Sequence, residues 1–202
     1  MMKDTVMETS ARGEAGFSLF ELVIAMTLTL MMMTAASSLL TSSVGTRARE
    51  NKRSDALSDA QRAVNIMSRE IANSGFGLSD NGIVTSDATA SKIRIRANVN
   101  NTNLTISDQD EDVTYIYQAA PVASIVRFDA ATGQTTVLAN NISAFKLVYQ
   151  DATSLPVAPA LAERITIDVT VEVGAPAGQP PQQVKLMSDV ALRNAPDVLD
   201  RY

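Results

Sequence analysis

The sequence predicts an α+β fold in which one long N-terminal helix packs on a C-terminal antiparallel β-sheet domain. Three observations predict it: an apolar run at residues 17–44, an apolar stripe at helical spacing within residues 57–71, and short alternating segments from residue 91 onwards. With 202 residues, the chain has room for one anchor helix and one modest domain.

Residues 17–44 form the most apolar part of the chain, and Glu21 is their only charged residue. The run exceeds the roughly 20 residues that a helix needs to span a bilayer. Ser, Thr and Ala residues recur along it, and such small residues permit close approach between helices in an apolar setting. We therefore expect a transmembrane helix over residues 17–44 that can also pack closely against other helices.

The helix is expected to continue as an amphipathic segment over residues 45–75, because no proline occurs before Pro121. Charged residues, Glu70 among them, lie off one apolar stripe, whose members are Leu57, Ala60, Val64, Met67 and Ile71. Gly75 and Gly77 supply a C-terminal stop, since glycine tolerates the left-handed conformation that ends many helices. A helix over residues 17–74 would be about 87 Å long at roughly 1.5 Å per residue.

Residues 76–202 are expected to form a β-rich globular domain. The clearest strand is 164–173, where Ile and Val alternate with polar residues, so one face is core and the other meets water. Gly133 suits a hairpin connection, and the Pro- and Gly-rich residues 174–183 predict an exposed loop. The predicted strands are residues 91–97, 113–118, 124–129, 135–138, 143–149, 164–173 and 184–192.

The most specific pattern lies where a polar leader, residues 1–16, meets the apolar run. The leader lacks an apolar core of its own, so it is not a secretory signal peptide of the usual kind. An ionised Glu21 in hydrocarbon costs roughly 2.5–3.5 kcal/mol and needs a partner. Cleavage after Gly16 would give Phe17 a positive α-amino group, which a Glu21 on a neighbouring copy could bind.

Residues 16–22 resemble the type III signal peptide of type IV pilins and of the pseudopilins of type II secretion systems. The resemblance implies a pilin-like fold, cleavage between Gly16 and Phe17 by a prepilin peptidase, N-methylation of Phe17, and extraction from the membrane into a filament. The motif residues that occur in the expected order are Gly16, Phe17, Leu19, Glu21 and Leu22.

The order of the downstream elements resembles PilW-like minor pilins, and the related J-type minor pseudopilins share much of it. The segments that carry this likeness are residues 69–77, 115–117, 125–128, 145–149 and 190–194. It implies a minor pilin in the inner membrane, with a single span and a periplasmic C-terminal domain. Its implied partners are other minor pilins, the major pilin, the prepilin peptidase and the inner-membrane assembly platform.

The function implied is to prime pilus assembly at the filament tip. Two alternatives stay open. A J-type pseudopilin would belong to the pseudopilus of type II secretion, and a pilus-tip adhesin would use the sheet domain to bind surfaces, DNA or cells.

A basic cluster, defined as Arg47, Arg49, Lys52 and Arg53, follows the apolar run. The positive-inside rule would place this side in the cytoplasm, but cleavage at Gly16 requires a cytoplasmic leader, and we let the motif take precedence. The cluster could bind anionic headgroups or the acidic patch of a neighbouring subunit. A solvated collar at the membrane edge is the simpler interpretation.

The composition argues against several function classes. A net charge of −5 and a pI near 4.8 disfavour nucleic-acid binding, which needs clustered Lys and Arg. The chain has no His and no Cys, which removes the commonest general base, the Ser-His-Asp and Cys-His arrangements, and most zinc sites. We therefore expect no enzyme and no cofactor.

An acidic run at residues 107–112 invites a calcium hypothesis, because Asp108, Asp110 and Asp112 have the spacing that brings oxygens around Ca²⁺. Val113 stands where a calcium loop of the EF-hand type needs Gly, and Ala119 where it needs a bidentate Glu. A solvated turn between strands is the favoured interpretation. Residues 101–103 likewise predict a turn, since Asn bonds to its own backbone.

Overall fold

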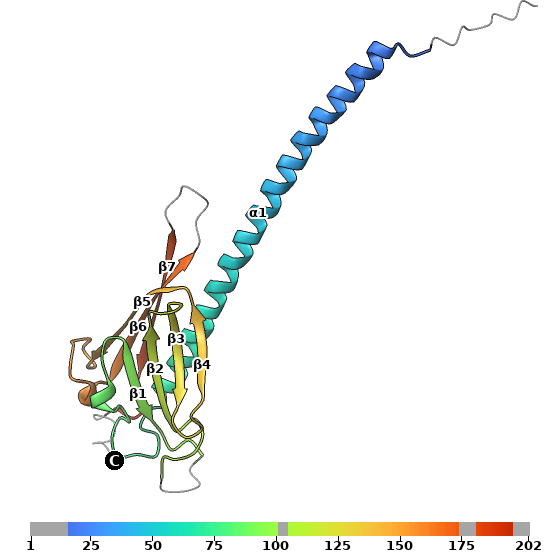
Figure 1. Ribbon diagram of the computed structural model, residues 1–202. Coiled ribbons are helices and arrows are strands. Elements are labelled where there is room, and N and C mark those ends of the chain that lie inside the picture. Colours follow the sequence, from blue (N-terminus) through green and yellow to red (C-terminus); the bar gives the residue numbers. More distant parts are fainter. Residues whose placement is uncertain (1–15, 101–104, 174–180, 196–202) are drawn as a thin grey trace, which may run out of the picture. The chain divides into compact units, whose positions relative to one another are not determined.

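The computed structural model describes residues 16–100, 105–173 and 181–195 (Figure 1). The predicted leader up to residue 15, the predicted turn at 101–103 and residues 174–180 of the predicted loop lie outside the described residues. The chain divides into two compact units, the first ending at Ala48 and the second beginning at Arg49, and each is described by itself. The predicted α+β class is confirmed: one long helix precedes antiparallel sheets.

Helix α1 spans Leu19–Ala72 and runs through both units. In the first unit its large apolar side chains are exposed, and the Thr hydroxyls bond to the helix's own backbone, as Thr29 does to the carbonyl of Ala25 at 2.7 Å. The helix contains a window with a mean hydropathy of 1.9, none of it buried, so it is long and apolar enough to cross a membrane.

In the second unit, α1 buries the predicted apolar stripe. Four of its five members are buried, and Leu57 is half-buried; Ala63, outside the predicted stripe, is buried as well. The helix ends as expected, because Gly75 and Gly77 follow it with φ values of +76° and +70°. The amphipathic pattern of this segment therefore reflects burial within the chain's own domain.

The strands form two antiparallel sheets, whereas one sheet was expected. The first holds β1 (Lys92–Arg96), β2 (Asp112–Gln118), β3 (Ser124–Asp129) and β4 (Thr135–Asn140) in that order. The second holds β5 (Ile142–Gln150), β6 (Arg164–Val173) and β7 (Gln182–Ala191). Between β4 and β5, Asn141 has a φ of 60°, a conformation that turns the chain away from an extended path and separates the sheets.

Every predicted strand is present, and β3 and β6 have the predicted bounds. The hairpin between β3 and β4 is confirmed too, with Gly133 at a φ of 66°. Two short 3₁₀ helices, Thr85–Asp87 and Pro159–Leu161, were not predicted.

One core joins both sheets to the second half of α1. The predicted alternation of β6 is confirmed, because Ile165, Ile167 and Val169 are fully buried. At the start of β2 both faces are buried, because Asp112 and Thr114 are buried as well as Val113 and Tyr115. Asp112 can be buried because two arginines of β1, Arg94 and Arg96, form ion pairs with its carboxylate.

The second half of α1 bonds to both sheets, which is consistent with its position among the strands in Figure 1. Ser68 shares a 3.0 Å hydrogen bond with Ser188 of β7, whereas Glu70 accepts one from Tyr115 of β2. After β7, the amide of Arg193 donates to the carbonyl of Ala72 at 3.0 Å. The end of α1 is thus hydrogen-bonded to both sheets and to the segment that follows β7.

Candidate functional site

The candidate processing site lies directly before α1. Gly16 and Phe17 are exposed residues outside regular structure, and Phe17 is 82% exposed. The amide of Leu22 donates to the carbonyl of Ser18 at 3.1 Å, so the helical bonding begins just after them. The peptide bond between Gly16 and Phe17 is therefore accessible.

Nothing in the described chain requires a glycine at position 16. A Cβ atom added to Gly16 would meet no atom within 4 Å, and no positive φ is recorded there. Gly82, by contrast, has a φ of +71° and backbone atoms 2.2 Å from the place of a Cβ. Packing and backbone conformation explain why position 82 is a glycine. Among the described residues, they give no reason for a glycine at position 16.

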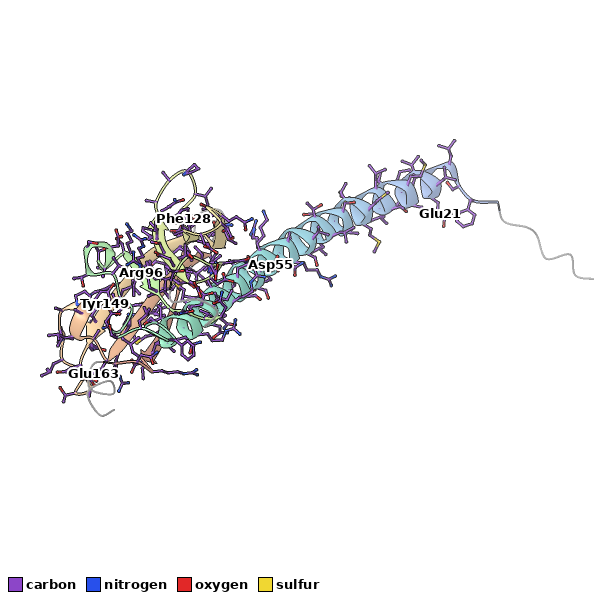
Figure 2. The ribbon with its side chains drawn as sticks, turned by 90° about the horizontal axis from the view of Figure 1, so that it is seen from below. Glu21, Asp55, Arg96, Phe128, Tyr149 and Glu163 are labelled. Carbon is purple, nitrogen blue, oxygen red and sulfur yellow. The ribbon has the colours of Figure 1, made fainter. Side chains whose placement is uncertain are left out.

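Glu21 lies in the first turn of α1, as Figure 2 shows. A carboxylate there interacts favourably with the positive end of the helix dipole, which contributes about 0.3–1 kcal/mol at an exposed site. Its large apolar neighbours on the helix are exposed, Leu22 at 54% and Ile24 at 43%. Within the described residues the Glu21 side chain has no ion-pair or hydrogen-bond partner.

Phe17 lies two residues before α1 begins at Leu19, and Glu21 lies in the first turn, so both are at the exposed start of the helix. A cation supplied from outside the chain could reach the Glu21 carboxylate without displacing any bond of the described residues. The arrangement can thus accept an ammonium group, and the apolar surroundings would strengthen the attraction by excluding water.

Each aspartate of the acidic run that was considered for calcium has a hydrogen-bond partner within the chain. Asp112 starts β2, and its carboxylate accepts hydrogen bonds from Nε and Nη2 of Arg94, both at 2.7 Å, and from Nε of Arg96 at 3.1 Å. Burial raises the pKa of Asp112, but the hydrogen bonds and charges of the two arginines outweigh it, so that pKa lies below its ordinary value. The predicted solvated turn is wrong for Asp112.

Asp110 and Asp108 also point to other partners. Asp110, with a φ of 68°, accepts a 2.6 Å bond from Arg127, and Asp108 accepts one of 2.6 Å from Asn100. Residues 108–111 do form a turn as predicted, but Glu111 at its end is buried, so the prediction that the turn is solvated is wrong there too. Across the described residues, no group of three or more carboxylates is arranged to hold a metal ion.

Sequence reasoning missed a polar network between α1 and the first sheet. Glu70, which the helical pattern placed off the buried stripe, accepts hydrogen bonds from the Tyr115 hydroxyl and from Nε of Arg127 at 3.1 Å. Tyr115 and Arg127 are cross-strand partners on β2 and β3. Strand alternation could have placed them on one face, but no local signal links them to Glu70.

The members of the basic cluster lie in different surroundings. Arg49 and Lys52 line a pocket of the second unit, Arg53 is half-buried outside that lining, and Arg47 belongs to the first unit. Its members are therefore distinguishable by experiment.

Comparison with known proteins gives one match, at the N-terminus. Residues 11–37 match the family model of the prokaryotic N-terminal methylation motif, and this range contains Gly16, Phe17 and Glu21. No curated protein and no solved structure matches the chain significantly. The matched motif is that of structural, pilin-type proteins, and together with the exposed apolar helix it fits a membrane-anchored protein. The chain therefore carries the N-terminal segment of a type IV pilin-like or pseudopilin precursor.

Proposed function

We propose that this protein is a PilW-like minor type IV pilin that assembles with other minor pilins and primes pilus assembly at the filament tip. One observation carries the proposal: within the methylation motif, Glu21 lies on the first turn of an exposed apolar helix and has no partner among the described residues. A partner from another subunit would satisfy both the carboxylate and the apolar surface.

The first step of the proposal is processing. A prepilin peptidase cuts between Gly16 and Phe17, and Phe17 is then N-methylated. The exposure of this bond supports the assignment, and so does the absence of any packing reason for Gly16. The requirement for glycine would come from the peptidase, whose active site must pass close to the backbone.

The second step is assembly. The α-ammonium of Phe17 on one subunit pairs with Glu21 on its neighbour, among the major and minor pilins, at the inner-membrane assembly platform. A carboxylate and an ammonium about 4 Å apart attract by roughly 4 kcal/mol at an effective dielectric constant near 20. Desolvation cancels part of this attraction, and the remainder sets the register between helices.

The topology follows from the processing step. The leader lies in the cytoplasm, residues 17–44 cross the inner membrane once, and the sheet domain lies in the periplasm. The window of mean hydropathy 1.9 in α1 supports the span.

Identification of the mature N-terminus tests the proposal. Mass spectrometry of the protein from its native host should find a chain that starts at methylated Phe17. Gly16→Val should leave an uncut precursor, whereas Gly45→Val, at another glycine with no atom near its Cβ position, should be cut normally. A start at another residue, or normal cleavage of Gly16→Val, would contradict the proposal.

A J-type pseudopilin of type II secretion is the second candidate, because the matched motif serves type IV pilins and pseudopilins alike. Deletion of the gene separates the two functions. Loss of surface pili with normal protein secretion supports the minor pilin, and the reverse supports the pseudopilin.

A further inference from the structure

A pocket of about 750 Å³ lies between α1 and the ends of β2, β5 and β6, within the second unit. Two cations of the helix, Arg49 and Lys52, contribute to its lining, and Glu172 near the end of β6 contributes a carboxylate. Tyr117 and Asn141 add polar groups. The pocket therefore presents both signs of charge to one occupant.

These charges have no partners within the described chain. Arg49, Lys52 and Glu172 are exposed, and none of their side chains makes an ion pair or a hydrogen bond among the described residues. Several other cations of the same unit are paired, such as Arg94 with Asp112 and Arg164 with Asp189, whereas Arg53, Arg69 and Lys146 make no ion pair among the described residues. A pocket that keeps opposite charges unpaired suits a ligand that carries both.

The position of the pocket in the chain indicates where the ligand comes from. Arg49 follows closely after Val44, the last residue of the apolar run, and α1 is continuous between them. In a membrane-anchored protein, residues that directly follow a span lie at the level of lipid headgroups. Bacterial and other membranes offer zwitterionic phospholipids at this level.

We propose that the pocket binds the phosphoethanolamine headgroup of a membrane phospholipid, with the phosphate at Arg49 and Lys52 and the ammonium at Glu172. The inference rests on the proposed membrane anchoring. The guanidinium of Arg49 can bind two phosphate oxygens at once, and Lys52, three residues on, reaches the same ligand from the same helix face. Ala56 and Ala123, both half-buried, add apolar surface to the lining.

Glu172 sets the choice between lipids. A primary ammonium donates up to three hydrogen bonds to a carboxylate, whereas the trimethylated ammonium of choline donates none. A phosphatidylglycerol headgroup has no cation for Glu172. A solvated basic collar would instead prefer the anionic lipid, since each nearby Lys or Arg is attracted to a negative surface.

The experiment uses the full chain in nanodiscs that contain equal amounts of phosphatidylethanolamine, phosphatidylcholine and phosphatidylglycerol. Native mass spectrometry identifies the lipids that stay bound after release. We expect phosphatidylethanolamine to be enriched about two- to fivefold over each of the others, the range that an exposed ion pair supports.

Four variants isolate the contacts. Arg49→Gln and Lys52→Gln should each lower the total lipid retained, and Glu172→Gln should abolish the preference for phosphatidylethanolamine over phosphatidylcholine. Arg53→Gln is the matched control, because it removes the same charge from the same cluster outside the pocket lining. Soluble phosphoethanolamine should displace the lipid better than inorganic phosphate does.

Three results would each overturn the inference: enrichment of phosphatidylglycerol in the wild type, an equal loss of lipid in Arg53→Gln, or displacement by inorganic phosphate as effective as that by phosphoethanolamine. The N-terminus of the same preparation is measured separately. A correctly processed protein without the lipid preference refutes this inference alone, and an unprocessed protein that shows the preference refutes the proposed function alone.

Discussion

The hydroxyl of Tyr115 donates a 2.5 Å hydrogen bond to the carboxylate of Glu70 and thereby joins the first sheet to α1. Tyr115 is fully buried, and Arg127 donates to the same carboxylate oxygen at 3.1 Å. One acceptor thus binds donors from two adjacent strands, which fixes the rotation of the helix against this sheet.

Tyr115→Phe should lower the free energy of unfolding by about 1.5–3 kcal/mol, since the lost hydrogen bond involves a charged acceptor. Chemical denaturation of the mature protein in detergent, followed by tyrosine fluorescence, measures the change. Tyr117→Phe is the control: its hydroxyl donates to the neutral carbonyl of Ile142 at 3.2 Å, so it should cost about 0.5–1.5 kcal/mol. Equal losses would argue against a special role for Glu70.

Alkaline pH should destabilise the domain through its buried tyrosines. Burial, and then the nearby Glu70 carboxylate, raise the pKa of Tyr115, and burial raises the pKa of Tyr149. Because the folded-state pKa values exceed the ordinary value near 10, this contribution to stability is fully present below pH 10 and is lost as the pH rises beyond it.

The slope of unfolding free energy against pH checks this prediction. Each buried tyrosine contributes at most about 1.4 kcal/mol per pH unit above pH 10. Tyr115→Phe and Tyr149→Phe should each reduce the slope, and the double variant should reduce it further. An unchanged slope in the double variant would show that other groups govern alkaline unfolding.

Gly82→Ala should be among the most damaging single changes in the domain. The residue has a φ of +71°, and a Cβ would lie 2.2 Å from the Arg96 carbonyl oxygen and from the Gly75 amide nitrogen. Left-handed strain costs roughly 1–2 kcal/mol and the forced backbone shift about 1–3 kcal/mol more. Thermal unfolding of the variant measures the loss.

Gly133→Ala separates the cost of left-handed backbone strain from the cost of the forced backbone shift. Gly133 has a similar φ of +66°, but a Cβ there would meet nothing within 4 Å. This variant should lose about 1–2 kcal/mol from backbone strain alone. If both variants lost the same stability, the close approach around Gly82 would have no energetic weight.

Glu21→Ala should still be cut at Gly16 but should enter filaments poorly. Removal of the carboxylate makes residence in the membrane less costly and leaves the ammonium of the neighbouring Phe17 unpaired, so both effects oppose extraction. The measurement is the ratio of this protein in sheared filaments to that in the membrane. Glu50→Ala, which removes an exposed carboxylate of α1 outside the apolar run, should be incorporated normally.

A fragment that begins at Arg49 should be a soluble, β-rich monomer. The second unit keeps the buried stripe of α1 with both sheets, and the exposed apolar residues of the first unit are removed. Circular dichroism and sedimentation provide the check. An unfolded or aggregated fragment would show that the domain depends on residues before Arg49.

The N-terminal site was predictable because all of its residues lie close together in the sequence. Gly16, Phe17 and Glu21 lie within one short segment, and their likeness to a processing motif needed no knowledge of the fold. The match of residues 11–37 to the methylation motif agrees with that prediction, and their processing and pairing stay predictions. The pocket that we propose to bind a lipid headgroup was not predictable, because Arg49 and Glu172 come from distant parts of the chain.

The sequence by itself determined the helix, its apolar and amphipathic halves, the strands and the turn at Gly133, because periodicity and glycine positions act within a few residues. The tertiary structure decided the division into two sheets, the turn of Glu70 toward Tyr115 and Arg127, and the pairing of Asp112 with Arg94 and Arg96. A carboxylate in a polar pattern looks solvated until a cation from another strand approaches it. Such contacts depend on which strands become neighbours, and local periodicity does not predict the order of strands in a sheet.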